Sequence, residues 1–281
     1  MPGMVLEGGT FRPIFSAGVM DALLDENIMF PYCIGVSAGI TDGFSYASRQ
    51  KERSLQILQR YRNDKRYLSA GNLVKNKSIF GINFVFEEIP NELIPFDWAT
   101  FAQYDGRFLV GVTNAQTGKI EYLNGKELDP KNTMVKATCA IPLVFPVVSL
   151  NGKEYYDGGI CDPIPVQKAM DDGHEKLLIV LTRPEGYIKT ESKSNKVAAK
   201  ILKNKYPNLV EPLLTRHIAY NETVALCEEL ERQGKAVLLR PAGDGIIDSF
   251  EKDVKRIETS YQYGYDLAKE RIGEIRALFE T

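Results

Sequence analysis

The sequence is poor in the side chains that most metal and redox sites require. It contains only two histidines, and its four cysteines include no C-x-x-C pair and no histidine neighbour at metal-ligand spacing. The cysteines are therefore expected to be reduced thiols in a reducing compartment, mostly as small core residues. They are Cys33, Cys139, Cys161 and Cys227. No metal or other cofactor is predicted.

Long apolar runs and a strong excess of one charge are also missing. The 35 basic and 37 acidic residues leave a net charge of −2, so no nucleic-acid partner is expected. No stretch approaches the roughly 20 apolar residues needed to cross a bilayer. Residues 4–6 run directly into a glycine loop, unlike the basic and apolar segments of a secretion signal. We expect a cytoplasmic protein; transient contact with a membrane surface and the oligomeric state stay open.

The sequence does contain short apolar strands that alternate with helices. With 281 residues, 44% of them hydrophobic and 26% charged, the chain is long enough to bury a large core. Strands are predicted at 4–6, 31–36, 107–113, 119–123, 147–150, 154–156, 176–182 and 236–239. Helices are predicted at 16–26, 38–48, 129–140, 165–172, 195–203, 208–233 and 250–279, with a further one ending near 62. This alternation predicts an α/β fold, a three-layer sandwich with a mostly parallel central sheet.

Two regions depart from the simple alternation. Residues 67–104 crowd aromatic and aliphatic side chains around two prolines, with no period of 2 or 3.6. This aromatic insertion is interpreted either as a lid or lining that meets acyl chains or an interface, or as an irregular segment with its own small core. The second region, residues 195–281, is mostly helical. Elsewhere, Pro142 and Pro146 predict an extended stretch at 141–146. We predict a single domain over 1–281.

The most informative motif has the form G-x-S-x-G, with Gly35, Ser37 and Gly39 at its fixed positions. In this pattern a strand turns sharply into a helix, and the bend holds a serine hydroxyl on its outer side. The turn needs glycine on both sides of the serine because larger side chains there would clash. We interpret Ser37 as a nucleophile; the alternative is a tight turn without chemistry.

A serine hydroxyl needs a base, and neither histidine is well placed to serve. His174 follows a helix-ending glycine and His217 lies on a predicted helix, so a structural role is favoured for each. Asp157 is the stronger candidate because it ends a strand and is followed by Gly158 and Gly159, which let its carboxylate approach another loop. A free aspartate is a poor base, but desolvation in a cleft would raise its pKa. The alternative for Asp157 is an aspartate that caps a turn.

The glycine loop after the first strand offers donors for a developing oxyanion. Gly8, Gly9 and Thr10 lie between a predicted strand and a predicted helix, where backbone N–H groups and the helix dipole act together. The competing interpretation is a phosphate cradle for a nucleotide. Neither G-x-x-x-x-G-K-[ST] nor G-x-G-x-x-G is present in this loop, so an oxyanion hole is preferred.

Taken in order, these motifs resemble those of the patatin-like phospholipase family, specifically its bacterial branch. The matching segments lie at 7–12, 35–39 and 157–159, and the proline stretch at 140–146 is similar too. The resemblance runs from residue 4 to about residue 182. It implies a patatin-like fold and a Ser–Asp dyad without histidine, carried here by Ser37 and Asp157.

The resemblance also gives roles to the glycine loop. It implies an oxyanion hole formed by Gly8, Gly9 and Thr10. It places Arg12 at the family's basic position, where the side chain would either steady a lipid phosphate or act as a surface charge or loop brace. Thr10 stands where the family usually has a third glycine, and a β-branched residue resists positive φ. Pro13 stands at another usual glycine and has no N–H to donate.

These inferences predict a serine acyl hydrolase that cleaves lipid carboxylic esters, of the phospholipase A or lysophospholipase type, and so acts in lipid degradation. Asp157 would take the proton of Ser37 as the serine attacks the ester, and water would release the fatty acid from an acyl-enzyme. One alternative is an α/β-hydrolase-type esterase with a Ser–Asp–His triad, for which the elbow comes too early in the chain. The other is a lipid-binding or regulatory protein with weakened catalysis, which Thr10 and Pro13 favour.

Overall fold

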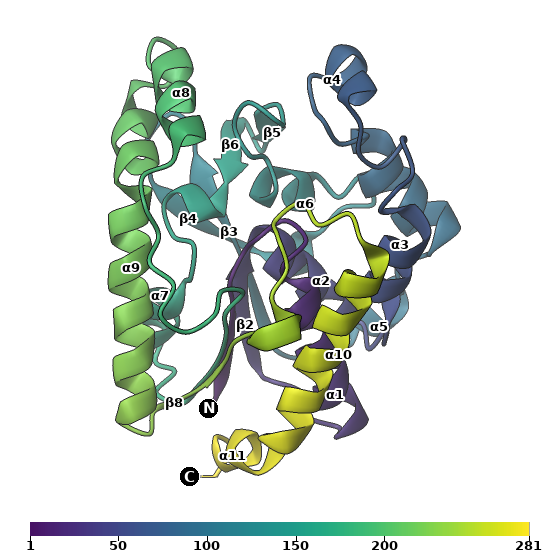
Figure 1. Ribbon diagram of the computed structural model, residues 1–281, viewed down its shortest axis with the longest axis vertical. Coiled ribbons are helices and arrows are strands. Elements are labelled where there is room, and N and C mark those ends of the chain that lie inside the picture. Colours follow the sequence, from purple (N-terminus) through teal and green to yellow (C-terminus); the bar gives the residue numbers. More distant parts are fainter. Residues whose placement is uncertain (281) are drawn as a thin grey trace.

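A central eight-stranded sheet organises the chain in the computed structural model, which describes residues 1–280 (Figure 1). The strands are β1 (Gly3–Leu6), β2 (Tyr32–Val36), β3 (Arg107–Asn114), β4 (Ile120–Asn124), β5 (Val148–Leu150), β6 (Lys153–Asp157), β7 (Leu177–Val180) and β8 (Ala236–Leu239). Their order is β5-β6-β3-β2-β1-β7-β8, and β4 pairs with β3 beside this path. The pairings from β3 through β2, β1 and β7 to β8 are parallel, and the other three are antiparallel. The prediction of a mostly parallel central sheet is confirmed.

Helices connect the strands and cover both faces of the sheet. The α-helices are α1 (Ile14–Asp25), α2 (Ser37–Ala47), α3 (Arg53–Tyr61), α4 (Ala70–Asn76), α5 (Trp98–Ala102), α6 (Thr133–Thr138), α7 (Val166–Asp171), α8 (Lys193–Leu202), α9 (Val210–Arg232), α10 (Val254–Glu270) and α11 (Ile272–Ala277). A π-helix, η1 (Phe84–Leu93), and the 3-10 turns η2 (Gly125–Glu127), η3 (Gly158–Ile160), η4 (Pro207–Leu209) and η5 (Gly243–Gly245) complete the described elements. In Figure 1, α7 and α9 lie on one side of the strands, and α1, α2 and α10 lie on the other. The three-layer arrangement is therefore the predicted one.

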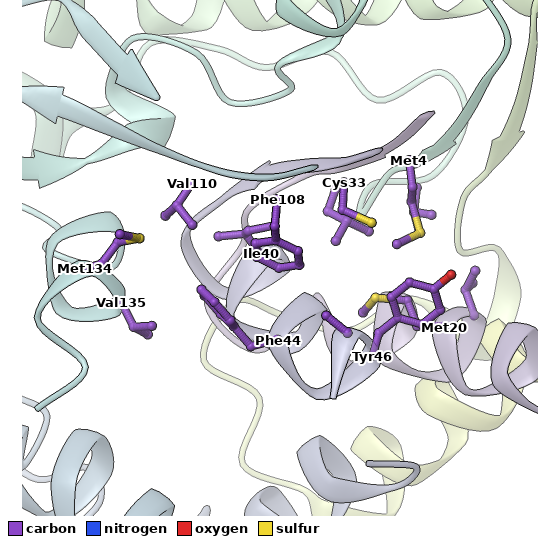
Figure 2. Close-up of a cluster of buried hydrophobic side chains, with 14 of the residues drawn as sticks. Met4, Met20, Cys33, Ile40, Phe44, Tyr46, Phe108, Val110, Met134 and Val135 are labelled. Atoms are coloured by element: carbon purple, nitrogen blue, oxygen red, sulfur yellow. The ribbon is translucent and has the colours of Figure 1, made fainter. Parts of the chain in front are cut away.

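The sheet divides the core into two layers because successive side chains of a strand point to opposite faces. Met4 and Leu6 of β1 belong to a cluster that includes residues of α1, α2 and α10, whereas Val5 between them belongs to a cluster with residues of α7 and α9. Figure 2 shows the first of these clusters, in which Phe44 of α2 and Phe108 of β3 lie together with their ring centroids 4.6 Å apart. Helix α2 is thereby fixed against the sheet next to the strand from which it starts.

The carboxyl ends of the parallel strands meet at one edge of the sheet, where α/β proteins usually bind ligands. β1 ends there in the glycine loop at residues 7–10, and β2 ends there in the turn that begins α2. Strand β6 reaches the same edge because its last residue, Asp157, pairs with Val112 near the end of β3. The three segments singled out in the sequence therefore converge in space.

The helix predicted at 129–140 is too long, because only α6 is helical within these residues. Asp129 forms a turn in which its side chain accepts a hydrogen bond from the Lys131 N–H at 2.7 Å. The helix starts only after Asn132, whose φ of 52° interrupts the helical backbone. The helix predicted at 250–279 is also shorter and is divided into α10 and α11 at Arg271.

The extended stretch predicted at 141–146 is a turn instead. The Phe145 N–H donates to the Ile141 carbonyl at 2.9 Å, and Leu143 has a φ of 73°. Proline restricts its own φ and disfavours helix at the residue before it, and a turn satisfies both restrictions as well as a strand does. Proline content alone therefore did not distinguish between the two.

The aromatic insertion at 67–104 is more regular than its sequence pattern indicated. It contains α4, the π-helix η1 and α5. In a π-helix the N–H of one residue bonds to the carbonyl five residues earlier, as Ile94 does to Ile89 at 2.8 Å. A side-chain repeat of this kind matches neither the period of 2 nor the period of 3.6. The expectation of an irregular segment is therefore wrong for η1, for this geometric reason.

Candidate active site

The predicted nucleophile, Ser37, lies at the turn between β2 and α2. Its φ of 54° is a left-handed conformation, which a residue with a side chain adopts only where the surrounding structure holds it. Two glycines let this turn pack against β1. A Cβ at Gly35 would lie 2.7 Å from the carbonyl oxygen of Leu6, and a Cβ at Gly39 would lie 2.2 Å from that of Glu7. Larger residues at either position would displace the serine.

Ser37 Oγ donates a hydrogen bond to Asp157 Oδ2 at 2.7 Å, across 120 positions of sequence. Only 5% of Ser37 and 7% of Asp157 is exposed. The second carboxylate oxygen, Oδ1, accepts from the Gly159 N–H at 2.8 Å. Burial raises the pKa of Asp157 above its ordinary value, although the Ser37 hydroxyl, the Gly159 N–H and the charge of Arg216 oppose the shift. The carboxylate therefore has the increased proton affinity that a base toward serine needs.

Two further contacts fix the serine and the aspartate relative to each other. A Cβ at Gly158 would lie 2.2 Å from the Gly111 carbonyl oxygen, so only glycine lets the loop after Asp157 pack on β3. The Thr138 hydroxyl accepts from the Ser37 N–H at 2.8 Å and donates to the Gly111 carbonyl at 2.6 Å. Sequence reasoning missed Thr138, because no local pattern marks a threonine at the end of a helix as the partner of a residue 101 positions earlier.

The glycine loop faces Ser37 from the end of β1. A Cβ at Gly8 would lie 3.0 Å from the Cβ of Ser37, so the backbone of the loop comes very close to the serine. Within residues 1–280, the N–H groups of Gly8, Gly9 and Thr10 have no backbone acceptor, whereas the N–H groups on either side of them do. Thr10 has a φ of 55°, so the loop holds a β-branched residue in the conformation that such residues resist. Unpaired backbone donors on a loop that approaches Ser37 at Gly8 are groups that an oxyanion hole would use.

Arg12 is buried and braces the loop. Its Nε donates to Thr182 Oγ1 at 3.2 Å, and its Nη1 donates to Ser249 Oγ. A Cβ at Gly9 would lie only 2.9 Å from Arg12 Nη2, so this end of the guanidinium lies against the glycine loop. Burial lowers the pKa of Arg12, while the nearby carboxylate of Glu7 opposes that shift. The surface-charge interpretation does not fit a side chain that is 8% exposed, and the loop-bracing interpretation does.

Ser37 opens onto an apolar cavity of about 1110 Å³, a volume that includes space open to solvent. Thr10 of the glycine loop also lines it. The aromatic insertion supplies much of the wall through Tyr67, Phe80, Val85, Phe86, Ile89, Pro90 and Phe96. Several of these residues also pack into a small cluster with Phe11 and Ile14. The insertion thus lines the cavity, and its inner side chains join clusters shared with other elements rather than a core of their own.

A few polar side chains interrupt the apolar wall. Asp42, five residues after Ser37 on α2, lines the cavity together with Arg53 and Ser54. Burial raises the pKa of Asp42 to about 7, although Ser54 and Arg53 oppose the shift. The Nε of Arg53 is buried and has no hydrogen-bond partner among the described residues. Sequence reasoning did not select these residues, because each is an ordinary helical position without a motif.

Neither histidine is hydrogen-bonded to the serine or the aspartate within residues 1–280. His174 Nδ1 is 2.9 Å from the carbonyl oxygen of Met1, and its ring stacks on Tyr32 at the opposite end of β2 from Ser37. His217 lies on α9 and, like His174, is not among the hydrogen-bond partners of Ser37 or Asp157 in the part of the chain that the structure describes. The structural interpretation of both histidines agrees with this placement.

The fold and the site place the chain among α/β proteins with a candidate serine nucleophile at the start of a helix. Comparison with known sequences gives the family. The chain belongs to the patatin-like phospholipase family, whose sequence model matches residues 4–170. A second family model, described as a domain of unknown function (DUF6363), matches residues 206–280.

Two known proteins illustrate how far the similarity extends. The chain is 27% identical over 187 residues to the uncharacterized protein YjjU of Escherichia coli (strain K12); the match covers 64% of this chain and 52% of YjjU. The chain thus spans about half the length of this curated relative. The crystal structure of VipD from Legionella pneumophila matches with a TM-score of 0.48 and 12% identity, over 96% of this chain and 66% of VipD.

Two features are absent from the part of the chain that the structure describes. No helix in residues 1–280 is both long enough and apolar enough to cross a membrane. In the same residues, no group of three or more His, Cys, Asp or Glu side chains is placed to hold a metal ion.

Proposed function

We propose that this chain is a serine hydrolase of lipid carboxylic esters, of the phospholipase A or lysophospholipase type. The observation that carries the proposal is the 2.7 Å hydrogen bond from Ser37 Oγ to Asp157 Oδ2. This pair is buried, yet the serine lines a cavity with mostly apolar walls, as a site for a fatty acyl chain should. Membership of the patatin-like phospholipase family supports a lipid ester as the substrate.

The proposed reaction uses one base in both of its steps. Asp157 accepts the proton of Ser37 Oγ as that oxygen attacks the ester carbonyl, and the proton then passes to the leaving alcohol. The free N–H groups of Gly8, Gly9 and Thr10 receive the negative charge that develops on the carbonyl oxygen. Water, deprotonated by the same carboxylate, then attacks the acyl-enzyme, and Asp157 returns the proton to Ser37 Oγ as the bond to the acyl group breaks and the fatty acid is released.

Labelling with a fluorophosphonate tests this assignment directly, because the reagent modifies activated serines. The native protein should bind one equivalent, and a Ser37→Ala variant should bind none. Ser149→Ala is the matched control because Ser149 is exposed on the edge strand β5 and should leave labelling intact. Stoichiometric labelling that persists in Ser37→Ala would refute the proposal.

A panel of esters of graded chain length, assayed with and without lipid vesicles, would then define the substrate. We expect turnover to rise with acyl length until the cavity is filled. Stimulation by vesicles would indicate transient action at a membrane surface. Lipid binding without turnover of any ester would instead favour a lipid-binding or regulatory protein, in which Thr10 has weakened the oxyanion hole.

A further inference from the structure

Four cationic side chains gather beside the glycine loop, on elements that are far apart in the sequence. Arg12 follows the loop, Arg183 and Lys189 lie between β7 and α8, and Arg216 lies on α9. Arg12 is buried, and the other three are partly exposed. Each of the four is an electrostatic neighbour of at least one other member. These four residues are called the cation cluster below.

Two members of the cation cluster contact the loops that flank Ser37 and Asp157. The guanidinium of Arg12 lies against Gly9, as described above. On the other side, Arg216 Nε donates to the Gly159 carbonyl, and a Cβ at Gly159 would lie 3.3 Å from Arg216 Nη2. None of the four cations lines the apolar cavity that Ser37 opens onto. An ester at Ser37 with its acyl chain in that cavity would therefore have its alcohol portion free to turn toward the cations.

The protein balances the positive charge of the cluster only in part, because two neighbouring carboxylates, those of Glu7 and Asp157, face four cations. No ion pair within residues 1–280 includes any of the four cations. The Glu7 carboxylate accepts its hydrogen bonds from two neutral donors, the Thr182 N–H at 2.6 Å and the Tyr220 hydroxyl at 3.1 Å, rather than from a cation of the cluster. Two of the four cations lie over aromatic rings: Arg183 Cζ is 4.4 Å from the ring centroid of Tyr187, and Lys189 Nζ is 4.4 Å from that of Tyr220.

This arrangement is unfavourable unless an anion joins it. Gathering like charges away from water costs free energy that aromatic contacts only partly offset. Burial, together with the charges of Arg216 and Arg12, lowers the pKa of Lys189 to about 7, and Glu7 opposes the shift only in part. The Nε of Arg183 is also buried and has no hydrogen-bond partner in the described part of the chain. A buried, unpaired guanidinium donor is a position that a ligand oxygen would satisfy.

We propose that the cation cluster binds the phosphate of a glycerophospholipid headgroup while the acyl chain occupies the apolar cavity. Guanidinium groups present paired donors that match phosphate oxygens, and a lysine adds a point charge, so the cluster suits a phosphodiester better than a neutral alcohol. This inference rests on the proposed function. Arg183, Lys189 and Arg216 lie outside residues 4–170, so the family match does not assign this site.

Binding to a catalytically silent protein tests the site without any hydrolysis. In a Ser37→Ala background, calorimetry should detect binding of glycerophosphocholine, a soluble phosphodiester headgroup. Lys189→Met and Arg183→Gln, each added separately, should weaken it about tenfold, as expected for loss of a charged hydrogen-bond partner. Lys203→Met is the matched control because Lys203 is exposed at the end of α8, and it should leave the affinity intact.

The outcomes separate a lipid site from a site for free phosphate. Binding of inorganic phosphate without binding of glycerophosphocholine would overturn the headgroup assignment, and binding of neither would overturn the site. If one of the variants Lys189→Met and Arg183→Gln has a lowered melting temperature, its affinity is not used, and the other variant tests the site. If the native protein cleaves no ester yet still binds glycerophosphocholine through the cluster, the proposed function fails while the anion site stands.

Kinetics on matched substrates provide the second test. The comparison is between dihexanoylphosphatidylcholine and dihexanoylglycerol, which share their acyl chains and differ in the phosphate headgroup. In Lys189→Met the ratio of their kcat/KM values should fall about tenfold, mainly through the KM of the phospholipid. An equal fall for both substrates would show that Lys189 supports the fold or the serine rather than the headgroup, and would refute the proposal.

Discussion

Thr10 and Ser37 hold the same left-handed backbone conformation, with φ of 55° and 54°, on two loops that line one cavity. Neither residue is a glycine, so each conformation carries a steric cost between Cβ and the backbone. The surrounding contacts hold both in place: Ser37 through its N–H to Thr138, and Thr10 through the loop that Arg12 braces. Other non-glycine residues, such as Asn132 and Leu143, also have positive φ, but Thr10 and Ser37 hold it where the proposed chemistry takes place, as is common at functional sites.

Replacing Ser37 by glycine should stabilise the protein relative to replacing it by alanine. Both variants lose the hydroxyl and its hydrogen bond to Asp157, so they differ only in the Cβ that strains a left-handed residue. We expect Ser37→Gly to exceed Ser37→Ala in free energy of unfolding by about 1 kcal/mol, measured by urea denaturation. Equal stabilities would show that the φ of 54° carries no strain.

Thr10→Gly should likewise increase the free energy of unfolding, by about 1 kcal/mol relative to Thr10→Ala. Glycine adopts positive φ without a clash, and it restores the residue that the family usually has at this position. Urea denaturation of the two variants measures the difference. A glycine variant less stable than the alanine variant would show that the φ of 55° carries no strain, and the strain argument for the loop would fail.

The raised pKa of Asp157 predicts the shape of the acidic limb of activity. A base must be ionised to act, so kcat/KM should fall as the pH decreases through the pKa of this carboxyl. Since burial raises that pKa, the midpoint should lie above the ordinary value of about 3.9. The profile is measured on a soluble ester. Asp157→Asn should reduce turnover by at least about a hundredfold, the lower range for loss of a general base. A limb centred at or below the ordinary value would contradict the assignment.

Neither histidine should be needed for turnover. His174 contacts the carbonyl of Met1 at the far end of the sheet, and His217 lies on α9 outside the hydrogen bonds of the serine and the aspartate. His174→Gln and His217→Gln should therefore keep kcat close to that of the native protein on the same ester. A decrease of about 10⁴ in either variant would support a Ser–Asp–His triad and refute the dyad.

The strands could be predicted because their signals are local. Continuous apolar runs mark the central parallel strands, and Asn151-Gly152 marks the hairpin between β5 and β6, where both residues have positive φ. The π-helix η1 could not be predicted, because its repeat matches neither helix nor strand periodicity. The turn at 141–146 was missed because proline is compatible with both turn and strand.

The residues of the candidate site likewise fall into those that a local sequence pattern predicts and those that only the fold brings together. Ser37 and the glycines around it follow from a local motif, because a sharp turn dictates its own residues. Thr138 and the members of the cation cluster other than Arg12 follow from tertiary contacts alone: Arg216 reaches the Gly159 carbonyl across 57 positions, and no local pattern in α9 marks it. Sequence reasoning found Asp157 because two glycines follow it, whereas its hydrogen bond to Ser37 became visible only in the fold.

Asp42 makes the stability of the protein depend on pH. Burial in the cavity wall raises its pKa to about 7, compared with about 3.9 for a free aspartate. The fold therefore favours the protonated form, so the contribution of Asp42 to stability is fully present below about pH 4 and is lost as the pH rises through 7. Asparagine resembles the protonated form at every pH. We therefore expect Asp42→Asn to be more stable than the native protein at pH 8, by at most about 4 kcal/mol at about 1.4 kcal/mol per pKa unit.

The difference between Asp42→Asn and the native protein should shrink as the pH falls from 8 to 4. Urea denaturation at several pH values measures it, and Asp105→Asn provides the control because Asp105 is exposed. A difference that is constant across this range would mean that Asp42 is ionised in the folded protein throughout. In that case the cavity beside Ser37 would carry a fixed negative charge at neutral pH, and an uncharged acyl chain would be a poor occupant for it.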